Sequence, residues 1–293
     1  MQLVLTVLEI VAPVFLLAAI GWVWVKLGQE YRIRFVTQLS MTLAVPCLIF
    51  NSLQNTSLDP GALSALTLAS IVAYGGVTLV MWLAVRITGV NSRTFLAPLI
   101  FGNTGNLGLP LALFAFGEVG LSYAVVVFAV MAIYSFTVGV WLVSGGGSPA
   151  KALKEPMVWA TILGAIFLWQ GWHTPVFVTN TLELVGQLAI PLMLITLGVA
   201  LARLTPSSFG MPISLSAFKV VACAAIAWGV GRWFGLPPVG FGVLVVQVAT
   251  PVAVTSYLLA EKYGADSDAV AGLVVVSTLI SVLALPLILA LVI

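Results

Sequence analysis

A candidate binding motif lies in the middle of an apolar stretch near residues 94–116. Its polar and helix-breaking residues are Asn103, Thr104, Gly105, Asn106, Gly108 and Pro110. Amide and hydroxyl side chains both donate and accept hydrogen bonds, so this motif can hold a polar ligand without a charged side chain. Backbone groups freed by glycine or proline inside a bilayer must face protein or a water-filled cavity. The motif therefore predicts a broken membrane helix beside a cavity; the alternative is a kinked helix whose amides only bridge neighbouring helices.

A second stretch, near residues 238–260, repeats this arrangement. Gln247 supplies the amide, Pro251 follows four residues later, and Thr250 lies between them. Corresponding interruptions in two halves of a chain are typical of secondary transporters. Each break starts a half-helix whose N-terminal N–H groups attract anions. Because the sequence places no Lys or Arg deep in a predicted span, we expect backbone dipoles and amides to hold an organic anion.

The composition indicates an all-α integral membrane protein. Of 293 residues, 61% are hydrophobic and 7% are charged, whereas soluble domains carry about 25% charged residues. A spanning helix needs about 20 apolar residues. The predicted segments lie near residues 3–26, 33–54, 62–86, 94–116, 121–143, 156–171, 177–203, 211–234, 238–260 and 268–292. The net charge of +2 indicates no nucleic-acid partner, and a single histidine argues against a metal site or an enzyme.

The basic residues predict how the chain is oriented. The connections between predicted spans are numbered in chain order. Ten of the eleven Lys and Arg residues lie in or beside odd-numbered connections, and only Arg232 lies beside an even-numbered one. By the positive-inside rule the odd connections are cytoplasmic, so both termini are expected outside the cell membrane. Lys26 is the first basic residue and follows the first apolar run, which argues against a signal peptide.

An internal repeat divides the ten predicted spans into two halves. Four pairs match at offsets of 141 to 146 residues: Pro13 with Pro156, Pro46 with Pro191, Trp82 with Trp228, and Pro110 with Pro251. Because five spans is an odd number, the second half should enter the membrane with inverted topology. The expected units are a first repeat over 1–143, a short cytoplasmic linker over 144–155 and a second repeat over 156–293.

Other polar residues are weaker candidates. Tyr134 and Ser135 could line the cavity from the fifth segment. Glu9 and Glu183 lie about six residues into predicted spans, where an acid is a candidate site for a coupling ion or an acid at the outer interface. No nucleotide-binding motif is present, so we expect transport driven by a gradient, coupled to Na⁺ or H⁺ if to any ion, without a cofactor.

The proline motifs resemble those of the auxin efflux carrier family. The residues that carry the resemblance are 102–111, 246–251 with 260–264, and 277–286. The resemblance covers essentially the whole chain, and the short linker indicates a compact, prokaryotic-type member in a bacterial inner membrane. It implies a fold like those of sodium/proton antiporters and bile-acid symporters, in which spans 4 and 9 cross at Pro110 and Pro251.

The same resemblance implies that the spans form two domains with different roles. Spans 1, 2, 6 and 7 would form a scaffold domain, often dimeric, and spans 3–5 and 8–10 a moving transport domain. The family carries organic carboxylates such as auxin, malonate or malate, although the residues around Tyr134 depart from the plant pattern and argue against auxin. The leading hypothesis is an elevator-type carrier of a small organic anion. The alternatives are a sodium-coupled symporter of the bile-acid type and a membrane sensor with this fold.

Overall fold

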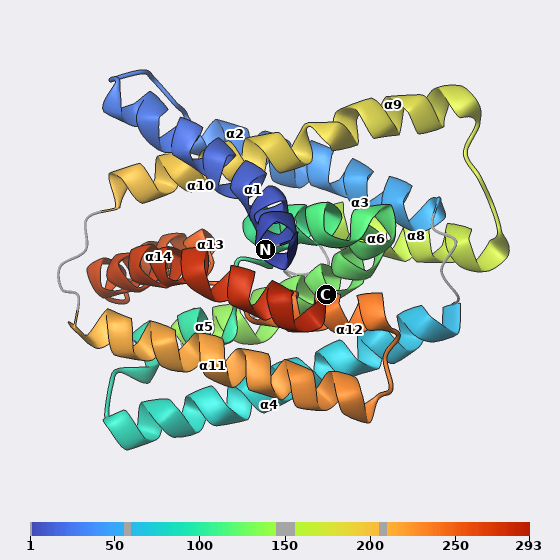
Figure 1. Ribbon diagram of the computed structural model, residues 1–293. Coiled ribbons are helices and arrows are strands. Elements are labelled where there is room, and N and C mark those ends of the chain that lie inside the picture. Colours follow the sequence, from blue (N-terminus) through green and yellow to red (C-terminus); the bar gives the residue numbers. More distant parts are fainter. Residues whose placement is uncertain (1, 56–59, 145–155, 205–209) are drawn as a thin grey trace.

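The structure is a computed structural model that describes residues 2–55, 60–144, 156–204 and 210–293, and these residues form a helical bundle (Figure 1). The helices are α1 (Gln2–Lys26), α2 (Ile33–Leu39), α3 (Val45–Gln54), α4 (Pro60–Thr88), α5 (Ser92–Ile100), α6 (Leu109–Tyr134), α7 (Val140–Ser144), α8 (Pro156–Gln170), α9 (Val176–Gln187), α10 (Ala189–Arg203), α11 (Gly210–Trp233), α12 (Pro238–Val248), α13 (Val254–Tyr263) and α14 (Ser267–Val292). Single π-helical turns precede α3, α6 and α7 at Ser40–Ala44, Thr104–Gly108 and Ser135–Gly139.

The length and composition of these helices are those of an integral membrane protein. Seven helical stretches of the described chain are long and apolar enough to cross a membrane, and α8 and α12 are shorter apolar helices. The count differs from the ten predicted segments partly because the 41 residues Thr104–Ser144 count as a single stretch, although they include the fifth predicted segment and part of the fourth. The backbone of Gly117 is not helical (φ 65°, ψ −159°), so α6 consists of two helices that meet at a kink where the sequence predicts the outer connection. The predicted linker 144–155 lies outside the described residues apart from Ser144, which ends α7.

The helices pack as two groups. In the first group α1 packs along α10, and α3 packs against α8 and α9. In the second, α4 packs beside α11, and α5–α7 and α12–α14 pack with them. Figure 1 shows α9–α10 with α2–α3 on one side of the molecule and α4 with α11 on the opposite side. The groups contact each other through α1 with α6 and α14, and through α3 with α6.

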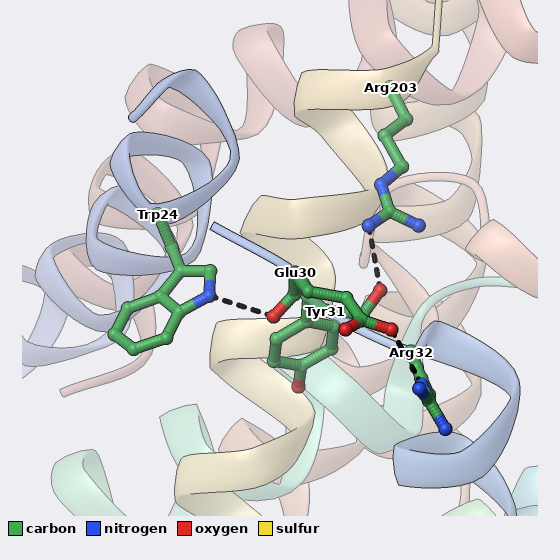
Figure 2. A network of polar contacts seen from close by, with 5 residues as sticks. All are labelled: Trp24, Glu30, Tyr31, Arg32 and Arg203. Carbon is green, nitrogen blue, oxygen red and sulfur yellow. Dashed lines mark hydrogen bonds and ion pairs between the residues drawn. The ribbon is translucent and has the colours of Figure 1, made fainter. Parts of the chain in front are cut away.

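Polar contacts hold the connection between α1 and α2 against the end of α10 (Figure 2). Arg203 Nη2 donates a hydrogen bond of 2.7 Å to the Tyr31 carbonyl oxygen, and the Tyr31 hydroxyl is 2.7 Å from Thr196 Oγ1. The ion pair of Arg32 with Glu30 is well exposed, so its contribution to stability is small. These contacts hold residues 30–32, which connect α1 to α2, against α10.

Candidate functional site

The two motifs identified in the sequence lie against each other. The first break separates α5 from the π-helical turn before α6 at residues 101–103, and the second separates α12 from α13 at 249–253. Gly102 and Val252 pair across the breaks as an isolated antiparallel β-bridge. A Cβ atom at Gly102 would overlap the Thr250 hydroxyl, so the approach of the two breaks requires glycine at this position.

Each break satisfies backbone groups of the other. The Asn103 N–H donates to the Pro251 carbonyl oxygen at 2.7 Å, and the Ala253 N–H donates to the Phe101 carbonyl oxygen at 3.4 Å. A helix can be interrupted inside a membrane bundle only where its freed backbone groups find such partners. The meeting of the two motifs, which are far apart in the sequence, therefore stabilises the interruption, and Ser277 of α14 adds to it by accepting the Val252 N–H at 3.0 Å.

The two prolines at which spans 4 and 9 are expected to cross occupy different places. Pro251 lies in the second break and takes part in the backbone contact. Pro110 lies in the first turn of α6, eight residues after Gly102. Because the helical run begins at Thr104, the missing N–H of Pro110 falls directly after the π-helical turn Thr104–Gly108, which interrupts the regular hydrogen-bond pattern there. The contact point on the first motif is thus Gly102 rather than Pro110.

The glycines of the first motif allow side chains to approach the π-helical turn. A Cβ at Gly108 would lie 2.8 Å from Gln247 Cδ, and a Cβ at Gly105 would lie 3.1 Å from the Phe128 ring. Real Cβ atoms essentially never come within 3.0 Å of another residue's atoms. Gly108 therefore leaves the space that the Gln247 amide occupies.

Three polar side-chain atoms at the breaks have no hydrogen-bond partner within the part of the chain that the structure describes. They are Asn103 Nδ2, Thr104 Oγ1 and Gln247 Oε1, and all three residues are at most 4% exposed. Thr250 differs, because its hydroxyl donates to the Gln247 carbonyl oxygen at 2.7 Å. A buried polar group without a partner costs about 1–3 kcal/mol. The breaks thus present two acceptor-capable oxygens and one N–H donor that a polar ligand could satisfy.

A cavity of about 590 Å³ lies between α3, α6 and the α9–α10 pair. Its polar lining residues are Asn51, Ser52, Asn55, Glu118, Ser122, Glu183 and Gln187. The volume suits a small organic molecule. Glu183 was a sequence candidate, whereas Glu118 was missed; its signal was the preceding Gly117, which marks a bend. Glu9 is exposed on α1 and is not among the lining residues, and the described residues contain no group of three or more His, Cys, Asp or Glu suited to a metal.

A second cavity of about 30 Å³ lies between α2, α10, α13 and the π-helical turns at Ser40–Ala44 and Thr104–Gly108, and the candidate Asn106 lines it. Its lining positions match those of the larger cavity at the offset of 145 that relates Pro46 to Pro191. The matching pairs are Leu48 with Met193, Asn51 with Thr196, Asn55 with Ala200, Thr37 with Leu182, and Met41 with Gly186. Positions that correspond in the predicted internal repeat therefore line one large and one small cavity.

Tyr134 and Ser135 are not among the residues that line these cavities. The Tyr134 hydroxyl lies 3.0 Å from Thr78 Oγ1, and its ring meets Phe101 edge-on with 5.5 Å between centroids. Ser135 begins the π-helical turn that follows α6 and is partly buried. Tyr134 therefore packs against Phe101 in the first break.

Lys219 contradicts the expectation that no basic residue lies deep in a predicted span. It is the tenth residue of α11 and is 1% exposed. Its Nζ donates a hydrogen bond of 3.0 Å to the Leu99 carbonyl oxygen at the end of α5. Lys219 is one of the ten basic residues that the sequence places at the flanks of odd-numbered connections, so nine remain to support the predicted orientation. The position of Lys219 near the end of a predicted segment does not reveal which neighbouring helix covers its side chain.

Comparisons with known proteins match this chain to membrane transporters along nearly its whole length. A family described as "Membrane transport protein" matches residues 6–152 and 141–289. An "Uncharacterized transporter" of Methanothermobacter thermautotrophicus is 28% identical over 95% of this chain and 96% of its own length. A second protein of that description, from Methanocaldococcus jannaschii, is 29% identical over 64% of each chain. A protein of Rhizobium meliloti named "Putative malonate transporter" is 23% identical over 93% of this chain and 92% of its own.

Proposed function

Because this chain belongs to the membrane transport protein family, we propose that it is a secondary transporter that carries a small organic anion, with the carboxylate held where the two helix breaks meet. Membership makes the chain a multi-pass membrane transporter rather than an enzyme, and it confirms the resemblance to auxin efflux carriers. The relative named for malonate supports a carboxylate as the substrate class.

The observation that carries the proposed site is the set of buried, unpartnered polar atoms at the breaks. Asn103 Nδ2 is a donor, and the Thr104 hydroxyl can donate or accept. The N-termini that begin after Asn103 and Ala253 have no side-chain cap. Half-helix N-termini of this kind favour negative charge. These groups offer a carboxylate hydrogen bonds that are not otherwise made within the described chain.

The proposed mechanism is alternating access of the elevator type in a ten-span inverted repeat. The group of α1–α3 and α8–α10 would be the scaffold, and the group of α4–α7 and α11–α14 would carry the substrate. The unequal cavities at repeat-equivalent positions support this mechanism, because exchanging the conformations of the two halves would close the larger cavity and open the smaller one. A hydrogen bond of 3.1 Å between Ser52 and Ser122 joins the groups at the wall of the larger cavity.

The test is uptake of labelled malonate, malate and indole-3-acetate into proteoliposomes, each with a sodium gradient, a proton gradient or neither. Asn103→Ala should lower uptake by about 10-fold or more, since its Nδ2 donor, without a partner among the described residues, is free for the carboxylate and a hydrogen bond to a charged group contributes about 1.5–3 kcal/mol. Gln247→Ala should lower uptake to a similar extent, because the Gln247 Nε2, which is 3.5 Å from the Ala124 carbonyl oxygen, is the donor that this side chain can offer a carboxylate. Asn180→Ala is the matched control, because Asn180 is an exposed amide on α9.

Full uptake by both site variants would refute the assigned site. No uptake of any acid by folded wild-type protein would refute the organic-anion substrate. Saturable binding of an acid without flux would instead favour the sensor hypothesis.

A further inference from the structure

Lys219 places an amino group without a carboxylate partner inside the described helix bundle. Its Nζ contacts the Leu99 carbonyl oxygen at 3.0 Å and the Cys223 sulfur at 4.0 Å. Neither partner carries a formal negative charge, and within the described ranges the side chain forms no ion pair with a carboxylate. A buried charge without a counter-charge is costly, and an ionisable residue in a membrane segment calls for a functional explanation.

The partner of Lys219 belongs to a half-helix end. Leu99 lies in the last turn of α5, immediately before the first break, where the carbonyl groups lose their intrahelical partners. The C-terminal end of a helix carries about half a negative charge. In transporters with broken helices, such ends and unwound carbonyls coordinate the coupling cation. In this chain the ammonium group of Lys219 already occupies that position.

The space beside Lys219 is too small for a further hydrated ion. A cavity of about 10 Å³ is bounded by Ser216, Lys219, Thr250, Pro251 and two serines of α14. That volume is about enough for the centre of one water molecule. Lys219 therefore fills the region between α11, the end of α5 and the second break.

The corresponding half-helix in the second half of the chain lacks such a cation. At the offset of 146 that relates Trp82 to Trp228, Lys219 corresponds to Ala73 on α4. The end of α12 is instead capped locally, because Thr250 Oγ1 donates to the Gln247 carbonyl oxygen. The buried lysine is thus present in one half of the chain only and is not required by the packing of both.

We propose that Lys219 is a built-in cation that takes the place of a bound sodium ion at the end of α5, so that the carrier holds its anionic substrate without a metal ion at the breaks. The proposal rests on the proposed transport function, but it concerns cation binding by the purified protein. Its test requires no flux, so the two proposals can fail separately.

The test compares the melting temperature (Tm) of purified protein in sodium chloride and in choline chloride at equal ionic strength. Wild type should show no sodium-specific shift. Lys219→Ala removes the ammonium group and opens its space, so sodium should raise the Tm of this variant saturably, by about 5–10 °C at about a hundred times its Kd. Lys219→Met removes the charge but fills the space, so it should show no such rise. Lys262→Ala, at an exposed lysine of α13, is the control and should behave as wild type.

Two results would overturn the proposal. One is saturable, sodium-specific stabilisation of wild type, because the site would then bind a metal ion in the presence of Lys219. The other is a Lys219→Ala variant that melts as wild type does in both salts. If neither Lys219 variant folds, the wild-type comparison still decides between the built-in and the bound cation.

Discussion

Replacing Gly102 by alanine should separate the two helix breaks. Gly102 pairs with Val252, and a Cβ atom added to it would overlap the Thr250 hydroxyl oxygen. The same atom would lie 3.1 Å from the Thr250 carbonyl oxygen, which is backbone and cannot rotate away. The methyl group therefore has no space unless the break between α12 and α13 moves.

The expected loss of stability follows from the displacement of the second break. Overpacking of this kind costs about 1–3 kcal/mol. Separation of the breaks also weakens the hydrogen bonds from the Asn103 N–H to Pro251 and from the Ala253 N–H to Phe101, each of which contributes about 1 kcal/mol. A total loss of about 3 kcal/mol would lower the Tm by about 6–12 °C, at about 2–4 °C per kcal/mol for a chain of this order of size.

The assay is a thermal melt of purified protein, combined with second-site variants at Thr250. Thr250→Ala removes the hydroxyl that the new methyl group meets, whereas Thr250→Val keeps a side chain of the same shape. Both variants lose the hydrogen bond from Thr250 to the Gln247 carbonyl oxygen, so that loss cancels in the comparison. Gly102→Ala should therefore cost less stability in the Thr250→Ala background than in the Thr250→Val background.

The control for added methyl groups is Gly229→Ala, at a glycine of α11 whose Cβ would meet no atom within 4 Å. This change should leave the Tm unchanged or raise it, because alanine favours a helix over glycine by about 1 kcal/mol. Equal costs of Gly102→Ala in the two Thr250 backgrounds would refute the steric reasoning.

Two further changes probe the first helix group. Gly198→Ala should lower the Tm more than Gly229→Ala does, because a Cβ at Gly198 would lie 2.6 Å from the Ala18 carbonyl carbon; equal melts would contradict the close packing of α1 on α10. Tyr31→Phe should cost about 1 kcal/mol at neutral pH through loss of the hydrogen bond to Thr196. Burial raises the pKa of Tyr31 above 10.0, although the Thr196 hydrogen bond lowers it to a smaller extent. The stability contributed by the protonated phenol is therefore complete below pH 10 and lost as the pH rises through the raised pKa. Melts of both proteins should converge at high pH, and a constant difference would contradict this assignment.

Local chemistry allowed much of the fold to be predicted from the sequence. Runs of apolar residues indicate membrane helices because each spanning helix must satisfy its backbone internally and present apolar side chains to lipid. The predicted segments 3–26 and 268–292 nearly coincide with α1 and α14. The motifs around Gly102 and Pro251 indicated both helix breaks, because glycine and proline act on the backbone of their own segment.

Only the tertiary structure decided which residues meet. Gly102 rather than Pro110 contacts the second break, because the bridge needs the absence of a side chain opposite Thr250. The sequence also assigned Lys219 to a flank, whereas the structure buries it against Leu99. A hydropathy pattern records how apolar a segment is, but it does not record which helix covers each face. Whether a polar group is paired, unpaired or beside a cavity depends on segments that are distant in the chain, and packing alone brings them together.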